Sequence, residues 1–133
     1  MESNNLERFV MAQEHVYAGV LDELRSGQKR SHWIWFIFPQ LRGLGKSEES
    51  HFYGIQDEAE ALEYFHHPEL GPRYLECLNL VHRHIVRRGK PAKELMGNDI
   101  DVLKLRSSLE LFSRVAPPNS LVRTFAQAIL AKN

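Results

Sequence analysis

Apolar residues recur at intervals of three and four positions along most of the chain, which is the spacing of an amphipathic helix. The first such stretch predicts a helix over residues 5–25, with Asn4 as its N-cap and Gly27 as its stop. The same spacing predicts four further helices, over residues 57–65, 72–88, 98–115 and 121–130. Asn98 or Asp99 is expected to cap the helix over 98–115, and Ser120 the last helix. Helices are therefore expected to form most of the structure.

The aromatic segment 33–38, with the sequence WIWFIF, fits two kinds of element. Its aromatic and β-branched content favours a strand, whereas its position between Ser31 and Pro39 suits a short buried helix with a cap and a stop. Residues 41–53 are rich in glycine and serine and are predicted to form a loop. With at most one short strand, the sequence predicts an all-α fold, a single compact multi-helix domain over residues 1–133.

Composition narrows the class of protein. The chain has 17 Lys and Arg against 17 Asp and Glu, so no overall positive charge attracts nucleic acid, and nucleic-acid binding is not expected. The single cysteine, Cys77, excludes an intramolecular disulfide and favours a reducing compartment. The first residues, MESNNLERF, lack the regions of a signal peptide, and the longest apolar run, 33–38, is too short to span a membrane. We expect a cytoplasmic protein that does not associate with membranes.

The tripeptide Gly45-Lys46-Ser47 matches the last three positions of the phosphate-binding loop G-x-x-x-x-G-K-[ST]. The first glycine of that motif would fall at position 40, where the chain has Gln40 directly after a proline, so the backbone cannot turn its N–H groups toward a phosphate. A nucleoside-triphosphate loop is therefore not predicted. Gly43, Gly45 and Ser47 remain candidates for offering N–H and hydroxyl donors to another anion.

The tryptophans of the aromatic segment, Trp33 and Trp35, have two interpretations. Indole rings usually fill a core because they are the largest apolar side chains. Together with Gln40, which follows the proline turn, they would instead form a stacking wall and an amide reader for a planar ligand. Each indole N–H needs a partner, which favours positions near the edge of the core.

The helix predicted over 98–115 carries Asp101, Lys104 and Ser108 inside its apolar arc. A charged group there must be paired or must reach water in a cavity. A carboxylate favoured by the helix dipole, a snorkelling lysine and a serine bonded to its own helix would explain the pattern without a site. The alternative is that these side chains form the polar floor of a pocket.

Two arginines have clear candidate partners. Arg73 lies at the edge of the apolar face of the helix over 72–88, where it would either bind a carboxylate or phosphate or pair with a neighbouring acid. Arg106 and Glu110 lie four residues apart and are predicted to pair in solvent.

The seven histidines form no chelating pair. His66 and His67 are adjacent, so their side chains diverge, and His82 and His84 lie about 200° apart around a helix. No metal site and no cofactor are predicted. No nucleophile, base and acid occur in a known order, so the sequence names no catalytic residue.

Five phrases of the chain occur together and in this order: LERFVMAQ, SHWIWFIFPQLRGLGKSEES, YGI, EALEYFHHPELGPRYLECL and DVLKLRSSLELF. In this combination the chain resembles a bacterial family of small, mainly helical proteins of unknown function, some of which carry the label calpastatin. The resemblance extends from Leu6 to about Phe112 and implies a compact helical monomer with no settled activity. It assigns no catalytic residue. The calpastatin label does not fit, because calpain inhibitors of that kind are disordered and this chain is rich in core-forming residues.

Two hypotheses for function follow. The first is a pocket that binds, or binds and hydrolyses, a small polar ligand such as a nucleotide or an ADP-ribose derivative. The residues predicted to form that pocket are Trp33, Trp35, Gln40, Gly43, Gly45, Ser47, Arg73, Lys104 and Ser108. The second is a non-catalytic helical module that binds another protein through its first or last helix.

Overall fold

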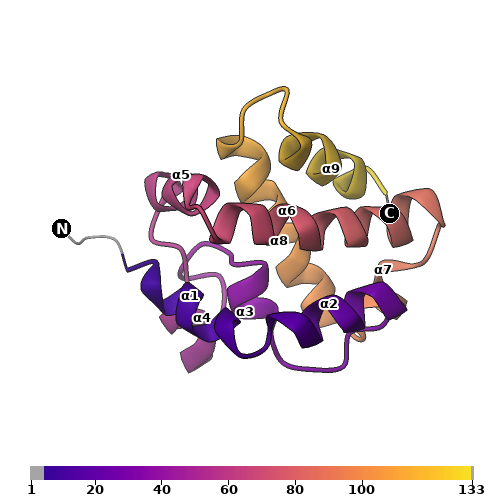
Figure 1. Cartoon of the computed structure of the whole chain (residues 1–133), viewed down its shortest axis with the longest axis horizontal. Helices are drawn as coiled ribbons and strands as arrows, with labels where there is room; N and C mark the ends of the chain where they lie inside the picture. Colours follow the sequence, from indigo (N-terminus) through magenta and orange to yellow (C-terminus); the bar gives the residue numbers. More distant parts are fainter. Residues whose placement is uncertain (1–4, 133) are drawn as a thin grey trace.

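The computed structural model describes residues 5–132, and helices form most of this part of the chain (Figure 1). Their bounds in chain order are α1 Glu7–Glu14, α2 Tyr17–Ser26, α3 Ile34–Ile37, α4 Glu48–Phe52, α5 Glu58–His66, α6 Leu70–His82, the π-helical turn η1 Arg83–Arg87, α7 Ala92–Met96, α8 Asp99–Val115 and α9 Leu121–Leu130. The one isolated β-bridge in the described residues joins Leu41 to Ile55. The predicted all-α class is therefore confirmed.

Two long helices, α6 and α8, form the centre of the molecule. In Figure 1, α6 crosses the middle of the view and α8 passes behind it. Both are packed against α5 and α9, while α2 packs on α6, and α3 and α7 pack on α8. The arrangement leaves α3 and the chain before α7 beside the first turns of α8.

Aromatic rings fill the space between these helices. The ring of Tyr74 on α6 lies 5.4 Å from that of Phe38 and 4.4 Å from that of Phe112 on α8, measured between ring centroids. The ring of Tyr64 on α5 lies 5.4 Å from that of Phe112. Burial of large rings contributes most of the apolar area removed from water, and tilted or edge-on pairs add about 0.5–1.5 kcal/mol each.

Local signals predicted several helix boundaries correctly. Asn98 caps α8, because its Oδ1 accepts a hydrogen bond from the backbone N–H of Asp101 at 2.8 Å. Ser120 caps α9 in the same way, accepting from the N–H of Arg123 at 3.2 Å. Gly27 ends α2 in the left-handed conformation, with φ of 83°. These contacts satisfy backbone groups that a helix end leaves unpaired.

Other predictions were wrong in detail. The helix predicted over 5–25 is two helices, because the chain turns at Val16, where φ is −120°. Its predicted cap, Asn4, lies outside the described residues. On either side of this turn, Gln13 donates from Nε2 to the carbonyl of Phe36, and Tyr17 donates to Glu76 on α6. The turn thus lets α1 contact α3 while α2 contacts α6.

Three further segments differ from the expectations. The ambiguous segment 33–38 is helical at α3, and the loop predicted over 41–53 contains α4, which Ser47 caps by accepting from the N–H of Ser50. The helix predicted over 72–88 starts two residues earlier and widens into η1 at its end. The starts of α4 and α6 have local partners, Ser47 and His67, whereas η1 has a distant one, because His84 donates to the carbonyl of Leu24.

A buried ion pair holds α1 to α5, and the same arginine also bonds the end of α4 and the residues after it. Arg8 lies 3.2 Å from Glu60 and donates at 2.8 Å to the carbonyls of Phe52 and Gly54. Both side chains are largely buried, with exposures of 2% and 8%. A buried charge needs such a complete set of partners.

Candidate functional site

The two tryptophans, Trp33 at the N-cap of α3 and Trp35 within the helix, lie in different surroundings. Trp33 is 2% exposed, and its Nε1 donates to Glu23 at 2.9 Å, so its indole is a fully paired part of the core. Trp35 is half-buried and turns toward α8. Because Trp33 precedes the first helical residue and Trp35 belongs to the helix, the two rings contact different neighbours.

The indole N–H of Trp35 is buried and has no hydrogen-bond partner within residues 5–132. Trp35 lines a gap of about 10 Å³, the Trp35 gap, whose other walls include Phe38, Gln40, Ser50 and Lys104. A space of this size holds about one oxygen atom or one water. Because an unpaired buried donor costs about 1–3 kcal/mol, this N–H is an unusual feature for a settled core.

Two further polar side chains at the Trp35 gap are also free of partners among the described residues. Lys104 is half-buried on α8, and no ion pair or hydrogen bond holds its ammonium group. The side chain of Gln40 is 8% exposed, and only its backbone carbonyl is bonded, accepting from Ile55 at 2.8 Å. The side chains of Lys104, Gln40 and Trp35, each with a polar group that lacks a partner among the described residues, thus belong to residues that line one space.

The glycine-serine loop closes one side of the Trp35 gap. Ser50 is 4% exposed, and its hydroxyl lies 3.1 Å from that of Ser47. Gly45 passes directly over Ser50, since a Cβ at position 45 would lie 2.6 Å from the Ser50 Cβ and 3.4 Å from the Gln40 Nε2. The loop therefore needs glycine at position 45 for close packing. Gly43 adopts φ of 98° in an exposed turn.

A wider groove adjoins the Trp35 gap and shares Trp35 and Lys104 with it. This outer groove has a volume of about 370 Å³ and lies between residues 29–32 and residues 96–104. Lys29 on one wall forms an ion pair of 2.7 Å with Asp101 on the other. Arg30 adds a cation without a carboxylate partner among the described residues. Cations therefore outnumber the single carboxylate of the outer groove, and we call the gap and groove together the Trp35 site.

Glu23 holds the segment 30–33, part of which lines the outer groove. Its carboxylate accepts from the N–H groups of Arg30 at 2.7 Å and Ser31 at 3.0 Å, from the Ser31 hydroxyl, and from Trp33. Burial alone would raise the pKa of Glu23, but these hydrogen bonds outweigh it and lower the pKa to about 2. The carboxylate is thus a permanent anchor for the segment that leads into α3.

The structure places the remaining predicted residues elsewhere. Arg73 donates from Nη1 to Gln13 at 3.3 Å and lies over the ring of Tyr17, at 5.1 Å from its centroid. Ser108 is completely buried and shares a hydrogen bond of 2.9 Å with the hydroxyl of Tyr74. Neither these two residues nor Trp33, Gly43, Gly45 and Ser47 line the Trp35 gap.

Sequence reasoning missed several contributors to the site. Lys29, Arg30 and Ser50 occur in segments without periodic pattern, so no local signal marks them. Glu23 is one of several acids on the polar side of the first predicted helix, and nothing distinguishes it until the loop folds back on it. For Asp101, the requirement that an inward charge be paired did predict the kind of environment that Lys29 supplies.

The described residues offer little reactive chemistry. They contain no group of three His, Cys, Asp or Glu side chains that could hold a metal ion. Burial raises the pKa of the Cys77 thiol to about 12, despite an opposing hydrogen bond to Tyr17, so this thiol is inert.

None of the helices in the described part of the chain has the length and apolar content needed to cross a bilayer. The arrangement at the Trp35 site is suited to binding.

Comparison with known proteins agrees with this picture. A family described as "Protein of unknown function (DUF1810)" matches residues 3–131. The chain is similar to a solved structure, the conserved hypothetical protein Rv1873 from Mycobacterium tuberculosis, at 46% identity and a TM-score of 0.85, over 96% of this chain and 85% of that one. No curated protein matches the chain. Neither description names an activity.

Proposed function

Since the chain belongs to the DUF1810 family, whose description gives no function, we propose one from the Trp35 site: it binds a small planar anion of the nucleotide class. The observation that carries the proposal is the buried, unpaired N–H of Trp35. An acceptor oxygen of a ligand would pair with this donor and remove its desolvation cost. The binding energy would thus come from a group that the folded protein already presents.

Charge supports an anion. Lys104 lies beside both the Trp35 gap and the outer groove and has no carboxylate partner among the described residues. Arg30 stands on the opposite side of the outer groove. A phosphate or carboxylate oxygen would gain a charge-assisted hydrogen bond from Lys104, which is about twice as strong as a neutral one.

Size and chemistry support a nucleotide-like body. The outer groove, at about 370 Å³, is near the lower end of the usual range for ligand pockets, about 300–1,000 Å³. This favours one nucleotide-sized unit, either a mononucleotide or one half of an ADP-ribose derivative. Trp35 supplies an aromatic wall and Gln40 an amide that can read a ring edge. No pair of free carboxylates stands at the groove, because Asp101 is held by Lys29, so the proposal is for binding without hydrolysis.

A thermal-shift and calorimetric titration tests the proposal. The probes are AMP, ADP-ribose, orthophosphate and uncharged adenosine, each at millimolar concentration. AMP or ADP-ribose is expected to stabilise the fold by about 1–3 kcal/mol near saturation, and adenosine by less. If no nucleotide shifts the melting temperature, the proposal fails.

Matched variants locate the binding. Lys104→Met keeps the aliphatic stem and is expected to weaken AMP by about tenfold, the value of one charge-assisted hydrogen bond. Trp35→Phe keeps an aromatic ring, removes the N–H donor and is expected to weaken AMP by about fivefold. The control is Lys46→Met, which removes an exposed cation of the neighbouring loop. Equal affinity in the Lys104→Met and control proteins would place the binding site elsewhere.

The other hypothesis, a protein-binding module using the last helix, has less support. The apolar residues Val122, Ala126 and Ile129 of α9 are buried against α6 and α8. Phe125 is half-buried and its ring lies 4.4 Å from that of His82. Only Leu121, at 56% exposure, extends an apolar side chain of α9 widely into solvent. A single exposed leucine is common on protein surfaces and does not mark an interface.

A further inference from the structure

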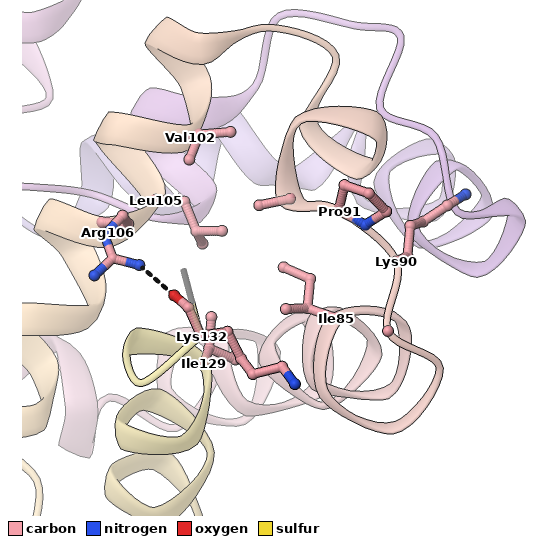
Figure 2. Close-up of a pocket in the computed structure, with 10 residues that line it drawn as sticks. Ile85, Lys90, Pro91, Val102, Leu105, Arg106, Ile129 and Lys132 are labelled. Carbon is pink, nitrogen blue, oxygen red and sulfur yellow. Dashed lines mark hydrogen bonds between the residues drawn. The ribbon is translucent and has the colours of Figure 1, made fainter.

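A second and larger cavity lies on another face of the first half of α8, bounded by η1, the chain that precedes α7, and α9 (Figure 2). We call it the α8–α9 cavity. Its volume is about 650 Å³, in the middle of the usual range of about 300–1,000 Å³ for ligand pockets. It shares no lining residue with the Trp35 site, so it can be tested independently of the proposed function.

The walls of the α8–α9 cavity are aliphatic. Ile85 from η1, Leu105 from α8 and Ile129 from α9 form the floor, and all three belong to the core. Val102 and Ala92 extend this surface toward the opening. Among the described residues that line the cavity, none is aromatic and none has a side-chain hydrogen-bond acceptor. Such walls can bury an alkyl chain, but they cannot stack a planar ring or read a base edge or sugar hydroxyl.

Among the described residues that line the α8–α9 cavity, every charged side chain is positive. Arg106 donates to the carbonyl of Leu130 at 3.1 Å and to that of Lys132 at 3.4 Å, so the predicted pair with Glu110 does not form. Carbonyl oxygens orient the guanidinium but do not neutralise it. The side chain of Lys132 extends from the end of α9 toward Ile85 in Figure 2, and no described acid pairs with it.

The third cation has a different role. The ammonium of Lys90 donates to the carbonyl of Gly27 at 2.8 Å and is directed away from the cavity in Figure 2. This contact fixes the rim to α2. Lys132 and Arg106 therefore form the charged part of the opening, on the α8–α9 side.

The backbone forms the cavity in advance of any ligand. In η1, His84 turns inward and its Nε2 donates to the carbonyl of Leu24 at 2.7 Å, while the next residue, Ile85, lines the cavity. The N–H of Lys90 then closes the turn on the carbonyl of His84 at 2.8 Å. π-Helical turns are rare and occur frequently at functional sites. Here the wide turn keeps an isoleucine at the cavity wall and a histidine in the core.

We propose that the α8–α9 cavity binds a medium-chain aliphatic carboxylate. The alkyl chain would lie on Ile85, Leu105 and Ile129, and the carboxylate would meet Lys132 and Arg106 at the opening. The absence of acceptors and rings in the described lining, together with the exclusively positive charge, selects this class over sugars, bases and cationic amphiphiles.

Three ligands of equal chain length test the proposal on the full chain: octanoate, octanol and octylammonium, titrated by calorimetry. Octanoate is expected to bind about fivefold or more tightly than octanol, because charge pairs at an open rim contribute modestly, and octylammonium is expected to bind most weakly. No binding of octanoate at millimolar concentration, or equal binding of all three, would overturn the proposal.

Two variants and a control complete the test. Lys132→Glu changes an exposed residue after the last helix and is expected to weaken octanoate about fivefold while leaving octanol unchanged. Ala92→Phe fills the cavity and is expected to abolish both, and if that protein does not fold, the Lys132→Glu result still decides. Lys46→Glu, an equal change of charge away from the cavity, is the control. Unchanged octanoate affinity in Lys132→Glu would overturn the proposal.

A last comparison separates a free carboxylate from a membrane lipid, which share an anionic head and an alkyl chain. The protein is sedimented with vesicles of phosphatidylglycerol in phosphatidylcholine. If the protein binds octanoate and does not sediment with the vesicles, the ligand is a free carboxylate. Vesicle association without octanoate binding would overturn the cavity as the site.

Discussion

Glu23→Ala is expected to destabilise the protein by about 3 kcal/mol, because one carboxylate accepts four hydrogen bonds. Three of the donors, on Arg30 and Ser31, lie in an exposed segment, where water can replace the lost acceptor at small cost. The fourth is the indole N–H of Trp33, a residue that is 2% exposed. Leaving that donor unpaired costs about 1–3 kcal/mol, and the lost ordering of residues 30 and 31 adds the remainder.

The pH dependence gives an independent check on the same contact. The hydrogen bonds hold the pKa of Glu23 at about 2 in the folded protein, below its ordinary value of 4.5. A lowered pKa means that the contribution is complete above the unfolded value and is lost as the pH falls from about 5 toward 2. Because the carboxylate is partly open to water, we expect a loss of about 1–2 kcal/mol over this range.

Urea unfolding followed by circular dichroism measures both effects. Wild type, Glu23→Ala and Glu23→Gln are compared at pH 7 and at intervals down to pH 3. The control is Glu63→Ala, which removes an exposed acid of α5 and is expected to change stability by less than about 0.5 kcal/mol. The reasoning would be refuted if Glu23→Ala were as stable as this control at pH 7 and lost as much stability as wild type between pH 5 and pH 3.

Three other expectations follow from the contacts. Arg8→Ala leaves the Glu60 carboxylate buried without its cation and is expected to cost about 3–5 kcal/mol in urea unfolding; a loss below about 1 kcal/mol would contradict the assigned burial. Gly45→Ala places a Cβ 2.6 Å from that of Ser50 and is expected to lower stability by about 1–3 kcal/mol, with partial recovery in the Gly45→Ala, Ser50→Gly double variant; additive losses would show that this contact is not the cause. Cys77, whose pKa burial raises to about 12, is expected to resist iodoacetamide at pH 8 in the folded protein and to react readily in urea; rapid alkylation without urea would show that the thiol is accessible.

Those parts of the fold that depend on local signals could be predicted from sequence. Asn98, Ser120 and Gly27 are helix boundaries with a side chain or backbone geometry that acts within a few residues. Ser120 and Gly27 were predicted outright, and Asn98 was one of the two caps expected for α8. The break at Val16 and the widening at η1 could not be predicted, because distant contacts set them: Gln13 with Phe36, and His84 with Leu24.

The residues of the candidate site show the same limit of prediction from sequence. Lys104 and Ser108 lie four residues apart on one face of α8, and one hypothesis from the sequence placed both on the polar floor of a pocket. The structure covers Ser108 with Tyr74 from α6, whereas Lys104, one turn earlier, lies beyond the reach of α6 and beside α3. Helical periodicity gives the direction of a side chain but not which neighbouring helix extends far enough to cover it.

The separation of the two indoles on α3 has a spectroscopic consequence. The chain has two tryptophans. Trp33 is buried and its indole N–H donates to the Glu23 carboxylate, whereas Trp35 lines the outer groove. Acrylamide or iodide in solution should therefore quench one emitting population and spare the other. The fluorescence of Trp33 thus reports whether the core is folded, and that of Trp35 reports binding in the outer groove, without any added label.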